Sequence, residues 1–291
     1  MATQPPPGTR RFEICIIHAL PLEARMGKVH AAGTACGLAS TFEHLKLALL
    51  MGICGASLRD TNGEDISLGD VVIGKHVVQY DLRRRYSHAF GMKDSPSEVL
   101  GRQNSEIRAS VSKIESQKEA IRDSTHRYLA ELLGKLDGRS GQLLEHSMPE
   151  DTRRTEAPAQ TIGRPAIHFG TVASGDSVVK CSQVRDAIAE QSQAIAFEVE
   201  GAGVWVYVPC IVVRDVSDYA DCRKDKQFQG YSAACASAYA RAIVEQWVVT
   251  ETRESRTAST TSERPVSFFN TASRTVNQGI TQTFSGQINN F

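Results

Sequence analysis

Residues 194–221 decide the fold and read AIAFEVEGAGVWVYVPCIVVRDVSDYAD. The runs 194–197 and 210–214 are apolar except for Arg214, and acidic residues follow each of them. Short apolar runs bounded by glycine or proline are typical of strands that are covered on both faces. We therefore predict two buried strands with carboxylates at their ends, which is a common place for general acid–base chemistry.

Further apolar runs alternate with helical patterns along the chain. The expected strands are 12–17, 47–54, 71–78 and 167–173, and the expected helices are 22–29, 97–136, 184–193 and 231–249. Alternation of strands and helices is typical of α/β folds. The pattern predicts a three-layer α/β/α sandwich around a mixed central sheet.

The net charge of the chain argues against some classes of binding partner. Its 291 residues carry 33 Lys and Arg against 33 Asp and Glu, so the formal net charge is zero. Proteins that bind nucleic acids or membrane surfaces usually show a clustered excess of basic residues. We therefore expect a small-molecule or protein partner, and neither a nucleic acid nor a membrane.

The apolar runs and the cysteines of the sequence indicate the cellular compartment of the protein. The longest apolar runs, 47–53 and 204–213, are far shorter than the roughly 20 residues that a membrane-spanning helix needs. The seven cysteines show no CxxC spacing, so the sequence indicates neither a disulfide framework nor a zinc site. We expect an intracellular protein, in the cytoplasm, without a cofactor or metal.

Composition divides the chain into three parts. We expect a disordered N-terminus at 1–11, a folded domain at 12–249 and a low-complexity polar tail at 250–291. From residue 266 onward the tail is rich in Asn, Gln, Thr and Phe, and Arg274 is its one charged residue. Such a segment can stack into cross-β ladders of amide side chains, or it can remain a solvated tail.

Several ordered motifs resemble the nucleoside phosphorylase and nucleosidase superfamily, of the purine and uridine phosphorylase type. The combination is similar to a branch found in fungal signalling proteins, often as an N-terminal domain. The motifs are ALPLE at 19–23, MGICGA at 51–56, LGDVV at 68–72, SGD at 174–176, Glu198 with Glu200, and SDYAD at 217–221.

This resemblance implies cleavage of the N-glycosidic bond of a purine nucleoside or nucleotide. Asp218 matches the acid that protonates the leaving base, and Ser217 would orient its carboxyl group. Glu200 matches the residue that accepts hydrogen bonds from the ribose hydroxyls. Glu23 matches the carboxylate that activates the attacking water in the hydrolytic members. Such groups stabilise a transition state in which the sugar becomes positive and the base negative.

The resemblance assigns further substrate contacts. Glu198 and Val199 belong to the predicted substrate-binding set, with Val199 where nucleosidases have methionine. Val178 stands where the family has an aromatic residue that stacks on the base. The backbone N–H groups of Gly52 and Gly55 could bind an anion, although these glycines could equally mark a tight turn.

The same resemblance leaves the attacking group and the activity open. The phosphate-binding arginine of the phosphorylases is absent at MGICGA, so hydrolysis by water is favoured over phosphorolysis. We interpret 30–46 as a linker too short for a βαβ crossover of about 30 residues, so part of the N-terminal sheet is expected to be missing. The alternative is a catalytically weak or inactive nucleoside-binding module that signals through self-assembly of its tail. Homo-oligomers are expected from the resemblance.

Overall fold

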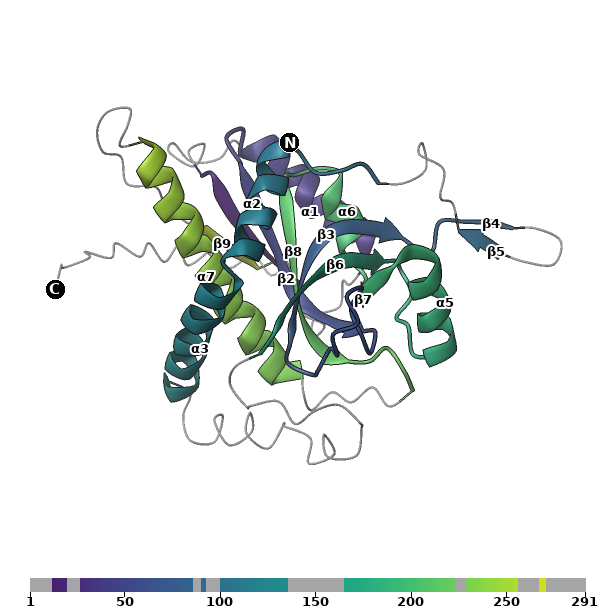
Figure 1. Cartoon of the computed structure of the whole chain (residues 1–291). Coiled ribbons are helices and arrows are strands. Elements are labelled where there is room, and N and C mark those ends of the chain that lie inside the picture. The colour runs from purple at the N-terminus through teal and green to yellow at the C-terminus, as the bar shows by residue number, and fades with distance from the viewer. Residues whose placement is uncertain are drawn as a thin grey trace.

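The computed structural model describes residues 12–19, 27–85, 90–92, 100–135, 165–222, 229–255 and 267–270. Its main sheet has seven strands, which are β1 (Ile14–Ala19), β2 (Leu47–Ala56), β3 (Val71–Gln79), β6 (Ile167–Ser174), β7 (Ala194–Glu198), β8 (Cys210–Asp218) and β9 (Ser267–Asn270). Their order across the sheet is β7-β6-β3-β8-β2-β1-β9 (Figure 1). A separate hairpin is formed by β4 (Arg83–Arg85) and β5 (Phe90–Met92).

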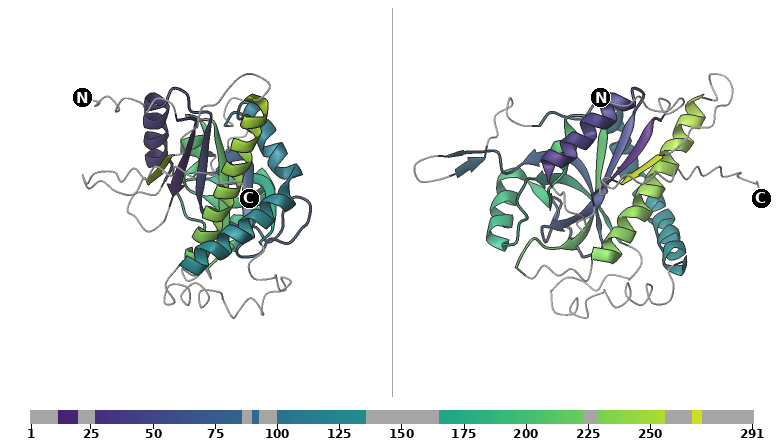
Figure 2. Two further views of the ribbon diagram at one scale, coloured as in Figure 1. Left: turned by 90° about the vertical axis from the view of Figure 1, so that its left-hand side faces the viewer. Right: turned by 180° about the vertical axis from the view of Figure 1, so that it is seen from behind.

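Helices cover both faces of the sheet. They are α1 (Lys28–Thr41), α2 (Ser105–Ser116), α3 (Lys118–Lys135), α5 (Ser182–Ser192), α6 (Gly201–Trp205) and α7 (Gln229–Ser255). Figure 2 shows α1 on one side of the sheet and α2, α3 and α7 on the other. The predicted α/β/α architecture is therefore confirmed. No helix in the described ranges is both long and apolar enough to cross a bilayer.

The sheet is mixed and closes on itself. β8 runs parallel to β2 and antiparallel to β3. β2 also pairs with β7 in antiparallel orientation, through Gly55 opposite Phe197. This extra pairing joins β2, β8, β3, β6 and β7 into a ring. The ring brings the carboxyl-terminal ends of β2, β7 and β8 together.

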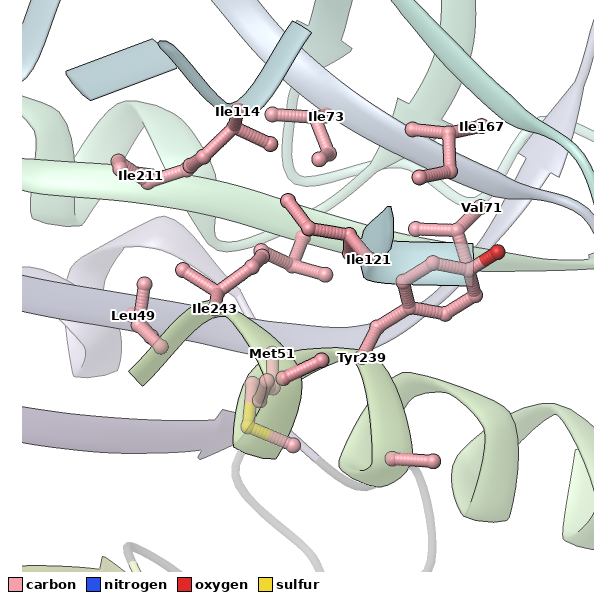
Figure 3. Packing of buried hydrophobic residues seen from close by; sticks show 14 of the residues in the cluster. Leu49, Met51, Val71, Ile73, Ile114, Ile121, Ile167, Ile211, Tyr239 and Ile243 are labelled. Atoms are coloured by element: carbon pink, nitrogen blue, oxygen red, sulfur yellow. The ribbon is translucent and has the colours of Figure 1, made fainter. Parts of the chain in front are cut away.

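An aliphatic core joins the sheet to the helices of one face. Leu49, Ile73 and Ile211 project from neighbouring strands and are fully buried. Ile121 of α3 and Tyr239 of α7 pack over them (Figure 3). Full burial of one such aliphatic side chain stabilises the fold by about 1.5–3 kcal/mol. This layer fixes β8, the strand that carries Asp218.

The linker interpretation of 30–46 was wrong. α1 occupies Lys28–Thr41 and connects β1 to β2, which are neighbouring parallel strands. β1, α1 and β2 thus form a βαβ unit. The helix was missed because its sequence, KVHAAGTACGLAST, has no broad apolar stripe, and Ala35 and Leu38 are its buried residues.

Two other predicted boundaries also change. The single helix expected over 97–136 is two helices, α2 and α3, separated at Gln117. Asn104 caps α2, because its side chain accepts a hydrogen bond from the backbone N–H of Ile107 at 2.9 Å. α7 continues to Ser255, beyond the expected end of the fold at Val249.

Part of the predicted tail belongs to the sheet. β9 runs parallel to β1, with Ser267 opposite Cys15 and Asn270 opposite His18. The other tail residues, 256–266 and 271–291, lie outside the described residues, as do 1–11. Tail-driven self-assembly and the disordered N-terminus therefore stay predictions.

Candidate active site

The candidate site lies where β2, β7 and β8 meet. Gly55 of β2 is opposite Phe197 on one side and Asp218 on the other. Glu198 follows Phe197 directly, so the acidic ends of β7 and β8 lie on either side of β2. The two acidic motifs of the sequence, which were predicted on separate strands, therefore meet at one place.

Asp218 is held on both carboxylate oxygens. It ends β8 and is 5% exposed. Its Oδ1 accepts a hydrogen bond from the backbone N–H of Ala220 at 2.9 Å. Its Oδ2 lies 3.0 Å from the Ser217 hydroxyl oxygen, which is also 3.2 Å from the carbonyl oxygen of Cys54. Ser217 therefore fixes the carboxyl group against β2.

Gly55 makes room for this carboxyl group. A Cβ atom at Gly55 would lie 2.8 Å from Asp218 Oδ1 and 2.8 Å from the Cβ of Ala220. Gly52 also lies inside β2, opposite Arg214. Both glycines are thus strand residues, and the tight-turn alternative is wrong. Anion binding by their backbone N–H groups stays a prediction.

Arg214 joins the two glutamates that follow β7. Its side chain is 1% exposed, and its Nη2 donates to the carboxylate of Glu198 and, at 3.0 Å, to Glu200 Oε2. Glu198 also accepts hydrogen bonds from the backbone N–H groups of Glu200 and Gly201. Glu198 is therefore bound to protein groups at the start of α6. Its predicted contact with substrate stays a prediction.

Glu200 is the more accessible partner of Arg214. Its side chain is 12% exposed, against 1% for Glu198. Burial raises the pKa of Glu200, the positive Arg214 opposes this rise, and Glu198 adds to it. Burial alone would lower the pKa of Arg214, but Glu198 and Glu200 raise it. Arg214 therefore remains charged between two carboxyl groups.

Arg214 also keeps one unused donor. Its Nε is buried and has no hydrogen-bond partner within the part of the chain that the structure describes. A buried donor without a partner is costly, by about 1–3 kcal/mol. A bound ligand or water that accepts this hydrogen bond would remove the cost.

One residue that borders the site was missed in the sequence. His18 at the end of β1 is half-buried, and its pKa is lowered by burial and by the charge of Arg214. Because Arg214 acts on His18, the end of β1 also borders the site. A histidine directly before ALPLE was the only signal, and a single histidine has many structural roles.

The SGD motif holds neighbouring elements together. Ser174 Oγ accepts a hydrogen bond from the backbone N–H of Ala202 at 2.9 Å, which ties β6 to α6. Asp176 accepts from the backbone N–H of Lys28 at 3.2 Å, at the start of α1. Lys28 Nζ lies 2.5 Å from Asp81 Oδ2 and 3.3 Å from Asp176 Oδ2. The motif thus connects β6 to the helices on one face of the sheet.

The structure describes two of the three remaining predicted site residues. Glu23 lies outside the described residues. Val199 is half-buried between Glu198 and Glu200. Val178 is 44% exposed on the segment after β6. The substrate roles predicted for these three residues stay predictions.

Comparisons with known proteins agree with this architecture. A family model described as "Phosphorylase superfamily" matches residues 5–246. A nucleotide-binding leucine-rich repeat (NLR)-like protein of Hyaloscypha variabilis is 28% identical over 244 residues, which cover 79% of this chain. The match spans only 24% of the length of that relative.

Nucleosidases are among the other relatives. The 5'-methylthioadenosine/S-adenosylhomocysteine nucleosidase of Mycobacterium tuberculosis is 25% identical over 76% of this chain and 77% of its own length. ATP nucleosidase Cap17 of Escherichia coli is 26% identical over 74% of this chain and 38% of its own length. The crystal structure of Helicobacter pylori 5'-methylthioadenosine/S-adenosyl homocysteine nucleosidase has a TM-score of 0.55 at 18% identity. The match covers 81% of this chain and 99% of that one, so the two share a fold.

Proposed function

This chain belongs to the phosphorylase superfamily, and on that premise we propose that it cleaves the N-glycosidic bond of a purine nucleoside or nucleotide. The observation that carries the proposal is the meeting of the Asp218 carboxyl group with the Glu198–Arg214–Glu200 cluster across Gly55. In this proposal the Asp218 carboxyl group gives a proton to the base, and the Glu200 carboxylate accepts hydrogen bonds from the sugar. These are the two capacities that the reaction requires.

Asp218 serves as the acid to the base. Breaking the glycosidic bond leaves negative charge on the purine, and a proton delivered to the ring neutralises it. Ser217 and the N–H of Ala220 hold the carboxyl group in one orientation. This support is the preorganisation that makes proton donation effective.

Glu200 faces the sugar. Its oxygens accept hydrogen bonds from ribose hydroxyls, and these bonds strengthen as the ring becomes cationic. Arg214 holds the carboxylate of Glu200 and is itself anchored by Glu198. Arg214 Nε provides a donor for a sugar oxygen or for the attacking water. Arg214 therefore positions Glu200 and is not a proton donor.

The attacking group in this proposal is water. Glu23 would activate it, as the resemblance implies. The MGICGA segment has no arginine for a phosphate ion, and Arg214 already contacts two glutamates. A phosphate ion bound here would need a further cationic side chain. We therefore favour hydrolysis over phosphorolysis.

A base-release assay tests the proposal. The purified protein is incubated with adenosine, inosine, methylthioadenosine and ATP, with and without phosphate, and free base is measured. We expect release from at least one of them without phosphate. Release that strictly requires phosphate would change the assignment to a phosphorylase. No release from any of the four would contradict the enzymatic proposal.

The second candidate is a nucleoside-binding signalling module. The similarity to one quarter of an NLR-like protein favours it, because such a region can act as one part of a larger assembly. Isothermal titration with the same four compounds separates the two functions. Binding without base release supports the module, whereas release supports the enzyme.

A further inference from the structure

A second cluster of ionisable side chains lies outside the candidate active site. His168 of β6 is 2% exposed, and its two ring nitrogens face two carboxylates. Nδ1 lies 3.1 Å from Asp60 Oδ2, and Nε2 lies 3.2 Å from Asp70 Oδ2. The side chains of Asp60 and Asp70 are 3% and 0% exposed.

Asp70 fixes the orientation of the imidazole. Its Oδ1 accepts a hydrogen bond from the backbone N–H of Ala166 at 2.7 Å, and its Oδ2 accepts from that of Ser67 at 2.8 Å. Asp70 is thus an acceptor held by the backbone, and Nε2 of His168 is the matching donor. A histidine whose one N–H is given to a carboxylate presents its other nitrogen as a ligand, which is the usual support of metal-binding histidines.

Nδ1 of His168 faces two carboxylates that could share a cation with it. The nitrogen, an oxygen of Asp60 and an oxygen of Glu64 all lie within 4.8 Å of one another. Ligand atoms about 2.1 Å from one metal ion lie roughly 3 Å apart. His168 Nδ1 and Asp60 Oδ2 lie 3.1 Å apart, as a direct hydrogen bond, and a bound ion would replace the proton between them. Glu64 is exposed, so rotation of its side chain can bring a carboxylate oxygen closer to His168 Nδ1 and to Asp60.

The loop between β2 and β3 brings Glu64 to this place. Asp60 Oδ1 accepts hydrogen bonds from the backbone N–H groups of Asn62 and Glu64, at 2.8 and 3.0 Å. The other oxygen of Asp60, Oδ2, remains directed at His168. The cluster holds three carboxyl groups, from Asp60, Glu64 and Asp70, and one imidazole. A divalent cation would balance this excess of negative charge.

We propose that Asp60, Glu64 and His168 bind one divalent transition-metal ion, with Asp70 orienting His168. One imidazole nitrogen and two carboxylate oxygens suit Zn²⁺ better than Mg²⁺, which prefers oxygen ligands alone. The ion ties the loop between β2 and β3 to β6. Through Gly69 N–H to Val216 O and Val216 N–H to Asp70 O, both 2.8 Å, this loop also holds β8, which carries Asp218.

Zinc binding to the chelator-treated full chain tests the proposal. We expect calorimetry to show one equivalent of Zn²⁺ bound and the melting temperature to rise with zinc concentration, since a ligand of the native state stabilises it. Mg²⁺ at the same concentrations should produce no comparable rise. An equal effect of both ions would contradict a role for the imidazole.

Glu64→Gln is the decisive variant, because Glu64 is exposed and the variant keeps the backbone contacts of the loop. We expect it to weaken zinc binding at least tenfold. Asp65→Asn is the matched control, since Asp65 is a half-buried acid of the same loop that pairs with Arg59 at 2.8 Å. It should bind zinc like the wild type. Equal affinity of wild type and Glu64→Gln, or no binding by wild type at submillimolar zinc, would overturn the proposal.

Discussion

Gly55 approaches Asp218 so closely that a Cβ atom on the glycine would lie 2.8 Å from the carboxylate oxygen Oδ1. No side chain larger than hydrogen fits between β2 and this acid. The position of the acid therefore depends on a residue of another strand.

Gly55→Ala should displace the Asp218 carboxyl group. The added methyl group collides with Oδ1 and with Ala220, and such overpacking costs about 1–3 kcal/mol. We expect base release to fall at least tenfold, measured as kcat, together with a small loss of stability. Gly37→Ala in α1 is the control, because among the described residues no atom lies within 4 Å of a Cβ built there. Full activity in Gly55→Ala would show that the acid does not need its observed position.

Arg214→Met should destabilise the fold strongly. It leaves Glu198 buried without its cation, and loss of one partner from a buried ion pair typically costs about 3–5 kcal/mol. Chemical denaturation measures the change in the free energy of unfolding. Arg241→Met is the control, since Arg241 is half-exposed and pairs with Glu131 and Glu245 at the surface. Similar losses in both variants would contradict the structural role assigned to Arg214.

The sequence predicted the individual strands of this site but not the contacts between them. β7 and β8 were recognisable because their apolar runs are continuous and end in acids. The contact of both strands with Gly55 depends on the ring closure of the sheet, and no local pattern encodes that closure. α1 was missed because helix propensity from alanine is a weak signal without an apolar stripe.

Buried charge pairs were equally hidden from the sequence. The motif predicts that Glu198 contacts the substrate, which stays a prediction. The structure adds contacts of Glu198 with Arg214 and with the N–H groups at the start of α6, and the sequence did not predict these. His168 and Asp60 lie far apart in the chain and come together only through the pairing of β3 with β6 and the loop before β3. Such contacts depend on tertiary structure alone.

The stability of the fold should decrease as pH rises through the raised pKa of His168. Burial opposes protonation of His168, but Asp70 and Asp60 raise its pKa above the usual value. A group with a raised folded-state pKa contributes stability below its unfolded pKa, and the contribution is lost as pH rises through the folded pKa. Melting temperatures measured with chelator present should therefore fall as pH rises from the unfolded-state pKa of His168 through its folded-state pKa. His168→Gln should have a lower melting temperature than the wild type and should lose this decrease with rising pH; an unchanged decrease would assign it to another group.

Truncation after Ser255 tests the contribution of β9. The strand adds a few edge hydrogen bonds to β1, and each contributes about 0.5–1.5 kcal/mol net. We expect a lowering of the melting temperature by several degrees, without loss of the cooperative transition. The truncated chain should also form no fibres if the tail drives self-assembly. An unchanged melting temperature would mean that β9 adds nothing to the sheet.

Base release by wild type and Asp218→Asn, compared side by side, tests the central claim most directly. Asparagine keeps the shape of the side chain but has no carboxyl proton to give, and proton donation by a positioned group is worth about 10²–10⁴-fold. Glu190→Gln, an exposed acid on α5, is the control. We predict release by wild type and control, and a loss of that size in Asp218→Asn at an unchanged melting temperature. Near-wild-type release by Asp218→Asn would contradict the assignment of the acid.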